Sequence, residues 1–148
     1  FLKTEHLGKH ISLLYRHSQI YFNAELRPYH LGSGQYIFLL SLLENDGINQ
    51  EQLASIVKID KTTTARAVAK LEREGYLTRE ISTDDRRAYI LHPTLKAREI
   101  QPAISSILDR WNESVFEGFR AEDKQNLREL LNRAIQNILN NEIKSNEP

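Results

Sequence analysis

The sequence predicts a mainly α-helical fold with one small β-hairpin, and three features support that prediction. Apolar residues recur at intervals of three and four over most of the 148 residues, which is the spacing of one helix face. Aromatic and β-branched residues gather in "YLTREI" (76–81) and "AYIL" (88–91), as is typical of strands. The charged segment "TDDRR" (83–87) between them suits an exposed turn.

The first part of the chain predicts two helices. We expect the first from Glu5 to about Leu26, ending before Pro28 because the residue ahead of a proline avoids the α conformation. The second is expected to begin with Ser33 as N-cap and to stop at Gly47. This second segment is apolar nearly all round, which indicates that it lies at the centre of the fold.

Two short helices are predicted next. In "NQEQLASIV", Asn49 as N-cap and Gln52 three residues later have the spacing of a capping box. After the link 58–59, "DKTTTARAVAKLEREG" repeats the arrangement, with Asp60 as N-cap and Gly75 past the end. The sequence therefore predicts two short helices joined by a tight turn.

The hairpin and two long helices complete the chain. Leu77 and Ile81 share one face of the first strand, and we expect that face to point toward the core and the tip to project outward. One long helix is expected to open at Pro93-Thr94, and another to cover about 122–143.

Composition excludes several classes of protein. Hydrophobic residues at 40% and charged residues at 27% are typical of a folded globular protein. The absence of cysteine excludes disulfides and thiolate metal sites. No apolar run approaches the roughly 20 residues that span a bilayer, and no signal-peptide pattern opens the chain, so we expect no membrane segment and a cytoplasmic location.

Charge is unevenly distributed although the net charge is zero. Residues 58–98 carry ten bases and six acids, a net of +4, whereas residues 1–57 and 99–148 carry −1 and −3. The basic middle coincides with the predicted short helices and the hairpin, so the charge pattern permits a nucleic-acid partner for that part of the chain.

Two short helices joined by a tight turn are the helix-turn-helix arrangement, whose second helix enters the major groove of DNA. On the second helix, Thr64, Ala67, Val68 and Leu71 form the stripe expected to be buried. The outward face offers hydroxyl and cationic groups that suit phosphates and base edges. These groups belong to Lys61, Thr62, Thr63, Arg66, Lys70 and Arg73. An ordinary amphipathic helix with a solvated polar face is the alternative.

A hairpin directly after such a helix matches the wing of a winged helix. Arg86 and Arg87 at its tip can reach the minor groove, whose negative potential attracts cations. Asp84 and Asp85 suit a surface that faces phosphates only if one of them orients an arginine or caps the turn. We therefore expect both arginines to contact DNA and Asp85 to orient them.

These motifs resemble the MarR (multiple antibiotic resistance regulator) family of winged helix-turn-helix transcription regulators. The family's wing pattern is Asp-x-Arg, five residues, then Leu-Thr, and here "DRR" (85–87) precedes five residues and Pro93-Thr94. "LGSGQYIFLLSL" resembles the family's Leu-Thr-x-x-Gln stretch, with Gly32 where threonine is usual. "LASIVKIDKTTTARAVAKLEREGYLTRE" is similar to its helix-turn-helix core through to the first wing strand.

The resemblance implies a single domain, 1–148, that forms a homodimer through helices in 1–30 and 100–148, with a DNA-binding lobe at 31–98. It implies a sequence-specific regulator, a repressor of a pseudo-palindromic double-stranded operator, that a ligand releases. The matching positions place Lys61, Thr62, Thr63 and Arg66 in the major groove, and Arg87 with Arg86 in the minor groove. The terminal helices also carry more apolar surface than a small lobe can cover, which favours a dimer over packing within one chain.

The resemblance also implies a small phenolic or aromatic effector between the dimer helices and the lobe. The candidates offer aromatic faces, hydroxyls and a partner for a carboxylate, although simple packing beside the core is the alternative. They are Tyr15, Arg16, His17, Tyr29, His30 and Tyr36.

Two other functions are open to such a chain, and a third is excluded. His6, His10 and His17 lie on neighbouring turns of the first helix and could make a metal-responsive regulator, but with no acidic cluster or thiol beside them we predict neither a metal site nor a cofactor. A winged helix used only for protein interaction is a second alternative. An enzyme is excluded, because the chain has no glycine-rich phosphate loop, nucleophile elbow or paired metal motif.

Overall fold

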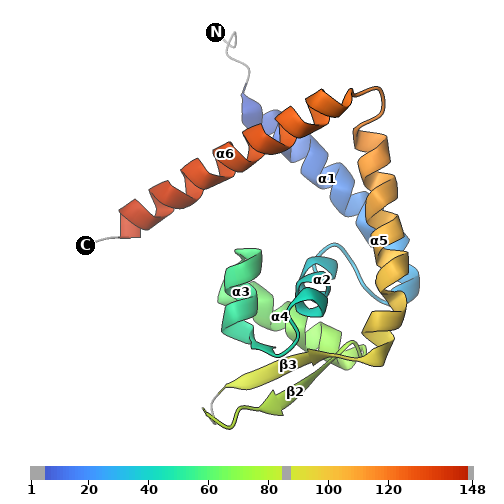
Figure 1. The fold of residues 1–148 in the computed structure, drawn as a ribbon, viewed down its shortest axis with the longest axis vertical. Helices are drawn as coiled ribbons and strands as arrows, with labels where there is room; N and C mark the ends of the chain where they lie inside the picture. Colours follow the sequence, from blue (N-terminus) through green and yellow to red (C-terminus); the bar gives the residue numbers. More distant parts are fainter. Residues whose placement is uncertain (1–5, 85–87, 147–148) are drawn as a thin grey trace. The chain divides into compact units, whose positions relative to one another are not determined.

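Helices make up most of residues 6–84 and 88–146, the part of the chain that the computed structural model describes (Figure 1). In chain order the elements are α1 (Leu7–Leu26), the 3₁₀ turn η1 (Arg27–Tyr29), α2 (Tyr36–Glu44), β1 (Ile48–Asn49), α3 (Gln50–Val57), α4 (Lys61–Arg73), β2 (Leu77–Ile81), β3 (Tyr89–Pro93), α5 (Leu95–Val115) and α6 (Ala121–Asn146). This confirms a mainly helical fold with a small sheet. No helix in the described ranges is long and apolar enough to cross a membrane.

The chain forms two compact units, Phe1–Trp111 and Asn112–Pro148. In the first unit, α1 to α5 and the sheet share one apolar core, where α3 and α4 lie beside α2 next to the strands (Figure 1). Its largest fully buried side chains include Phe38, Leu53 and Leu71. The second unit contains α6, whose apolar side chains stay largely exposed in the single chain.

Local capping fixes the helix-turn-helix pair as predicted. The Asn49 side chain accepts from the Gln52 backbone N–H at 2.8 Å, and Gln52 Oε1 accepts from the Asn49 N–H at 2.9 Å. Asp60 accepts from the Thr63 N–H at 2.8 Å and begins α4. Between the helices, Lys58 adopts a left-handed conformation with φ of 56°, which ends α3.

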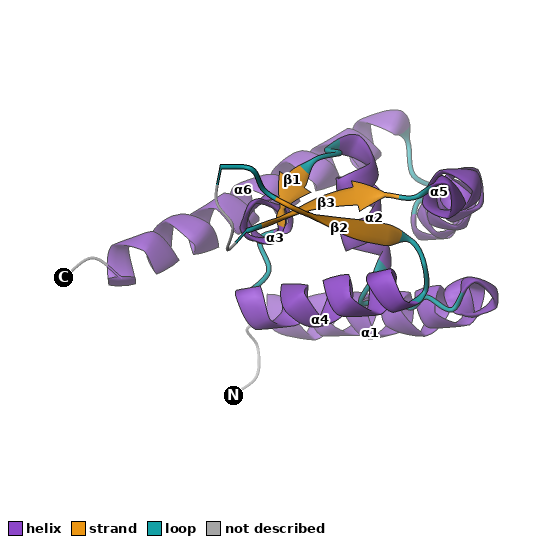
Figure 2. Ribbon diagram, turned by 90° about the horizontal axis from the view of Figure 1, so that it is seen from below, coloured by secondary structure: helices purple, strands orange, loops and turns teal. Residues whose placement is uncertain are grey.

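The sheet has three antiparallel strands in the order β1-β3-β2, and sequence patterns predicted only the hairpin (Figure 2). Pro93 lies in β3 opposite Leu77, not in the first turn of α5 as expected. Thr94 N–H bonds to Tyr76 O and Ser82 N–H to Ala88 O, so Leu77 and Pro93 form a pair without hydrogen bonds. Because β1 pairs only with Ile90 and Leu91, the missing N–H of Pro93 removes no ladder bond.

Three other expectations were wrong in detail. The N-cap of α2 is Gln35 instead of Ser33, because Asn23 Oδ1 accepts from the Ser33 N–H at 2.7 Å and holds this residue in the preceding turn. Helix α2 also ends at Glu44, before Gly47, whose N–H bonds to Leu91 O. Ile81 shares a strand face with Leu77 but does not reach the core as expected. Its exposed fraction is 60%, whereas that of Leu77 is 1%, because β2 extends beyond the core at Ile81.

The Asn23 side chain lies close to position 32, which holds glycine where the MarR pattern has threonine. A Cβ at Gly32 would lie 2.7 Å from Asn23 Oδ1, the atom that accepts from Ser33. Gly32→Ala should therefore displace the amide, break this hydrogen bond and lower the unfolding free energy by about 0.5–1.5 kcal/mol. Urea unfolding followed by circular dichroism measures the change.

The same substitution in an Asn23→Ala background is the matched control. There it should be neutral or slightly stabilising, because alanine restricts the unfolded chain more than glycine does. An equal loss in both backgrounds would contradict the proposed clash.

Candidate nucleic-acid interface

Helix α4 buries one side and exposes the other as the sequence predicted. Thr64, Ala67, Val68 and Leu71 are buried, and the Thr64 hydroxyl donates to the Asp60 carbonyl at 2.8 Å. On the opposite side, the predicted DNA-contacting residues are exposed except Lys70, which is half-buried; they are Lys61, Thr62, Thr63, Arg66 and Lys70.

Several of these side chains line a hollow of about 460 Å³ between α4 and the start of α2. Thr63, Arg66 and Lys70 contribute from α4, and Gly34 and Gln35 contribute from the turn before α2. The structure therefore brings three of the predicted contact residues together on one surface and adds the α2 turn, which sequence reasoning did not include.

The carboxyl end of α4 is fixed by contacts from distant segments. Lys96 Nζ donates to Glu74 O at 2.6 Å, and the Thr94 hydroxyl donates to Gly75 O at 2.7 Å. The buried Tyr76 donates its hydroxyl to Tyr29 O, also at 2.6 Å. These bonds set where the helix ends and where β2 begins.

The wing carries different chemistry on its two faces, because side chains alternate along a strand. Arg79 and Tyr89 lie on the face of Leu77, and Glu80 and His92 lie on the other. The predicted tip residues Asp85, Arg86 and Arg87 lie outside the described residues, so their roles remain predictions.

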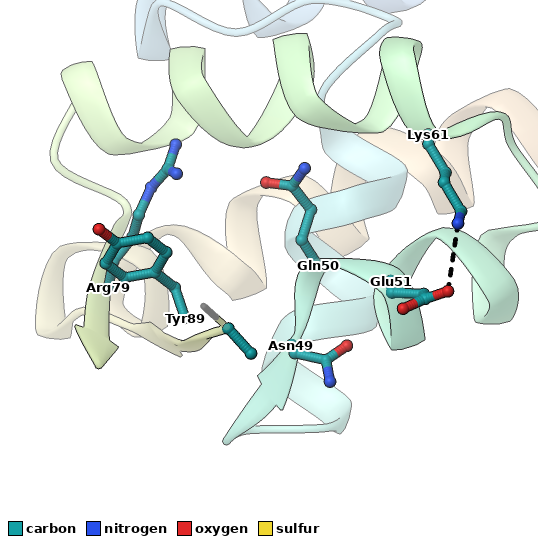
Figure 3. A pocket seen from close by; sticks show the side chains of 7 residues that line it. Asn49, Gln50, Glu51, Lys61, Arg79 and Tyr89 are labelled. Atoms are coloured by element: carbon teal, nitrogen blue, oxygen red, sulfur yellow. Dashed lines mark hydrogen bonds and ion pairs between the residues drawn. The ribbon is translucent and has the colours of Figure 1, made fainter. Parts of the chain in front are cut away.

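A second hollow, of about 420 Å³, lies between α3, α4 and the wing (Figure 3). Arg79 and Tyr89 stand on one side of it and Lys61 with Glu51 on the other, with Gln50 between them. Lys61 Nζ lies 3.2 Å from Glu51 Oε1. Sequence reasoning missed Arg79, although strand alternation from Leu77 was a signal that could have placed it on this face.

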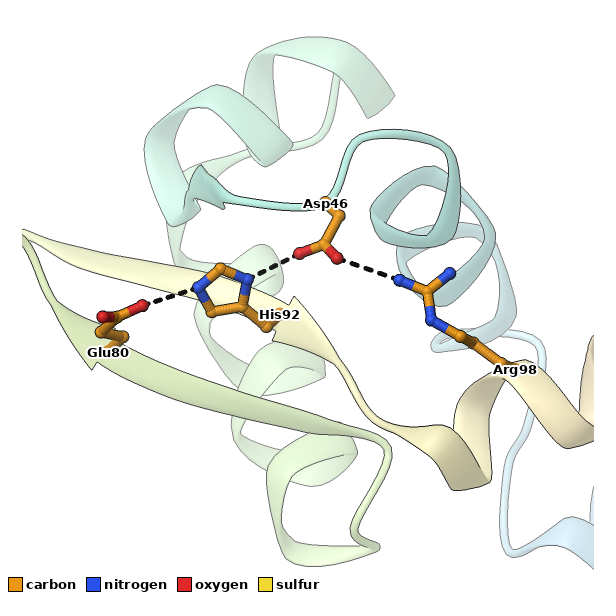
Figure 4. A network of polar contacts seen from close by, with 4 residues as sticks. All are labelled: Asp46, Glu80, His92 and Arg98. Carbon is orange, nitrogen blue, oxygen red and sulfur yellow. Dashed lines mark hydrogen bonds and ion pairs between the residues drawn. The ribbon is translucent and has the colours of Figure 1, made fainter.

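A network of polar side chains occupies the other face of the wing (Figure 4). His92 Nδ1 lies 2.6 Å from Asp46 Oδ1, and Nε2 lies 2.8 Å from Glu80 Oε2. Arg98 on α5 donates to the second oxygen of Asp46 at 2.9 Å. The hydrogen bond to Asp46, and then the one to Glu80, raise the pKa of His92 above its ordinary value of 6.5. The network joins β2, β3, α5 and the turn before β1.

The predicted effector residues are only partly brought together. Tyr15, Arg16 and His17 are exposed on α1, and His30 is exposed with a left-handed φ of 58°. Neither hollow described above includes a predicted effector residue.

Tyr36 is the effector candidate whose surroundings raise its pKa. It is half-buried and its ring lies 4.8 Å from that of Phe22. Burial, and then the nearby Tyr15, raise the pKa of Tyr36 above 10.0. The structure therefore places these two tyrosines near each other.

The three histidines proposed for a metal, His6, His10 and His17, are exposed. Among residues 6–84 and 88–146, no group of three His, Cys, Asp or Glu side chains is placed to hold a metal ion.

Comparison with known proteins decides the family. Residues 31–89 match the profile of the MarR family. An uncharacterized HTH-type transcriptional regulator of Bacillus subtilis, YybA, is 35% identical over 116 residues, which are 78% of this chain and 77% of YybA. The chain belongs to the MarR family. It is therefore a transcription regulator with a DNA-binding fold and not an enzyme.

Solved structures of MarR-family proteins agree with this assignment. A MarR transcriptional regulator from Methanosarcina mazei Go1 is 42% identical with a TM-score of 0.83, over 90% of this chain and 96% of its own. A putative MarR family regulator from Listeria monocytogenes, solved in complex with a 26mer DNA, is 28% identical with a TM-score of 0.87, over 98% of both chains.

The His92 network makes the stability of this MarR-family protein depend on pH. Because a carboxylate only accepts, both ring nitrogens can donate only when His92 is protonated. Its folded-state pKa is raised, so its contribution is complete below the unfolded value of about 6.5 and is lost as pH rises through the folded pKa. Urea unfolding across this range should show wild type losing its advantage over His92→Gln as pH rises.

An NMR titration of the His92 ring measures the same effect directly. Asp46→Asn should lower the pKa of His92 more than Glu80→Gln does, because the hydrogen bond to Asp46 is the largest cause of the elevation. A constant difference between wild type and His92→Gln at every pH would show that the ring acts only by packing.

Proposed function

We propose that this MarR-family protein is a dimeric repressor that binds a pseudo-palindromic operator in the cytoplasm and leaves it on binding a small aromatic or phenolic ligand. The observation that carries the DNA-binding role is the exposed face of α4, where Thr62, Thr63 and Arg66 stand opposite a fully buried stripe. A helix anchored at both ends presents such groups in a fixed orientation, which base recognition requires.

The proposal assigns each DNA-contacting residue to the major or the minor groove of the duplex. Lys61, Thr62, Thr63, Arg66 and Lys70 enter the major groove with α4. Arg86 and Arg87 extend from the wing into the minor groove, and Asp85 orients them. The 26mer DNA bound by the Listeria relative supports DNA as the partner.

The exposed apolar residues of α1 and α6 support a homodimer formed by segments 1–30 and 100–148, around the lobe at 31–98. Apolar side chains of both helices are half exposed or more in the single chain, and surfaces of this kind mark interfaces. They are Leu7, Ile11, Leu14, Ile20, Leu130 and Ile138. A twofold dimer would contact two half-sites about 34–36 Å apart, which requires a pseudo-palindrome.

The ligand-release step is supported by Tyr36 and the nearby Tyr15, which offer two hydroxyls, and by the Phe22 ring, which lies 4.8 Å from the ring of Tyr36. Such a combination suits a ring that bears a polar group. Arg16, His17, Tyr29 and His30 complete the proposed ligand site. Release is tested by adding a panel of phenols and aromatic carboxylates to the preformed complex with DNA.

The experiment that tests the DNA-binding role starts from duplexes selected by the protein from a random library. Fluorescence anisotropy then compares the selected duplex with a scrambled one across salt concentrations. Tight binding to the selected duplex, falling linearly in log K against log salt, is expected. Failure to enrich any sequence, with weak binding to duplexes of unrelated sequence, would favour a protein-interaction module.

Arg66→Ala should weaken binding to the selected duplex by about 1–3 kcal/mol and change scrambled-duplex binding much less, if Arg66 contacts a base edge. Arg98→Ala is the matched control, because Arg98 lies on α5, outside the segments proposed for the dimer, and pairs with Asp46 at 2.9 Å. Equal losses on both duplexes for Arg66→Ala would limit this residue to a phosphate contact.

Arg87→Ala should weaken operator binding and leave the dimer intact, because the proposal gives Arg87 a minor-groove contact and no part in the dimer. Sedimentation should still give twice the 17.2 kDa of one chain. Unchanged operator affinity would refute the minor-groove role of Arg87, and a monomeric wild-type protein would refute the dimer.

A further inference from the structure

The wing face that continues from the core turns polar where β2 leaves the lobe. Leu77 is buried on this face, Arg79 follows two residues later, and Tyr89 lies on the neighbouring strand. The Arg79 guanidinium carbon lies 5.8 Å from the centre of the Tyr89 ring. Both side chains line the 420 Å³ hollow that α3 and α4 close from the other side (Figure 3).

Each of the two cations that line this hollow already has a carboxylate partner. Arg79 Nε lies 2.9 Å from Glu72 Oε2, and Lys61 Nζ lies 3.2 Å from Glu51 Oε1. Lys61 and Glu72 are eleven residues apart on α4, which is close to three helical turns, so they share the side that faces the wing. Cations from two elements therefore flank one hollow, each neutralised by an acid from another element.

We propose that this hollow binds a backbone phosphate of the bound duplex. The phosphate displaces Glu72 from Arg79 and Glu51 from Lys61. The inference rests on the DNA-binding role proposed above. It adds Arg79 as a phosphate contact and gives Glu51 and Glu72 the role of placeholder anions.

The exchange is electrostatically favourable because the existing pairs are weak. The side chains of Lys61 and Glu51 are 80% and 76% exposed, and those of Arg79 and Glu72 are 29% and 43% exposed. Breaking an exposed pair of this kind changes an equilibrium by about 1.5- to 5-fold. A duplex offers one negative charge per roughly 1.7 Å of its axis, and its phosphates release condensed counterions when cations replace them.

The geometry of Arg79 also suits an exchange of one oxyanion for another. A guanidinium presents donors in a planar fork that binds carboxylates and phosphates alike. The nearby Tyr89 ring limits where the guanidinium can move, so the fork stays close to the hollow after Glu72 leaves.

The test is a double-mutant cycle read by anisotropy on the selected and scrambled duplexes. Arg79→Gln should weaken binding to both duplexes by a similar factor and reduce the slope of log K against log salt by about 0.9, the value for one phosphate. Glu72→Gln should strengthen binding to both by about 1.5- to 5-fold, because no pair has to break. In the Arg79→Gln background, Glu72→Gln should have no such effect.

Glu99→Gln is the charge-matched control, because it removes the same charge from an exposed position on α5 that lies outside the segments proposed for the dimer. The inference is overturned if Arg79→Gln leaves affinity and slope unchanged. It is also overturned if Glu72→Gln strengthens binding equally with and without Arg79, which would be a general charge effect. Wild-type protein that selects no sequence would instead refute the DNA-binding role itself.

A second double-mutant cycle, at Lys61 and Glu51, keeps the proposal testable if the Arg79 variants fail to fold. Lys61→Gln and Glu51→Gln alter two highly exposed side chains, and thermal unfolding can verify that the fold is retained. The same pattern is expected: weaker binding without Lys61, stronger binding without Glu51, and no Glu51 effect when Lys61 is absent. Additive effects in this cycle would overturn the proposed exchange.

Discussion

The position of α4 depends on a hydrogen bond buried at its first turn. Thr64 has no exposed surface, and its hydroxyl is satisfied by the carbonyl of Asp60, which also begins the helix through its carboxylate. A buried hydroxyl without such a partner would be costly, so this local bond lets Thr64 pack into the core and hold the start of α4 there. Lys96 and Thr94 bind the last carbonyls of the same segment. With both ends fixed, the exposed face of α4 has a defined direction.

The two-residue period of a strand lets one hairpin perform two tasks. On one face, His92 links Glu80 to Asp46 and so joins the wing to the lobe. On the other, Arg79 and Tyr89 face the hollow beside α4. A shift of the β2–β3 register by one residue would exchange these faces, so the core contact at Leu77 fixes the chemistry of both.

Local signals predicted the helices well and distant contacts poorly. The caps Asn49 and Asp60 act within three residues, so the sequence identifies them, and the resemblance to MarR regulators identifies the winged helix. Ser33 failed as a cap because Asn23, ten residues earlier, binds its N–H. Strand β1 has two residues and exists only through pairing with β3. The partner of His92, Asp46, lies 46 residues away, a separation that no local motif encodes.

A net charge of zero is compatible with binding a polyanion because the charges are paired locally. At the hollow, Glu51 and Glu72 hold Lys61 and Arg79, so these two pairs add little positive potential when DNA is absent. This limits attraction to any polyanion at long range, since paired charges cancel beyond a Debye length of about 8–10 Å. At contact the pairs can exchange partners, because each costs little to break. The two pairs at the hollow therefore contribute at contact and not to attraction over a distance.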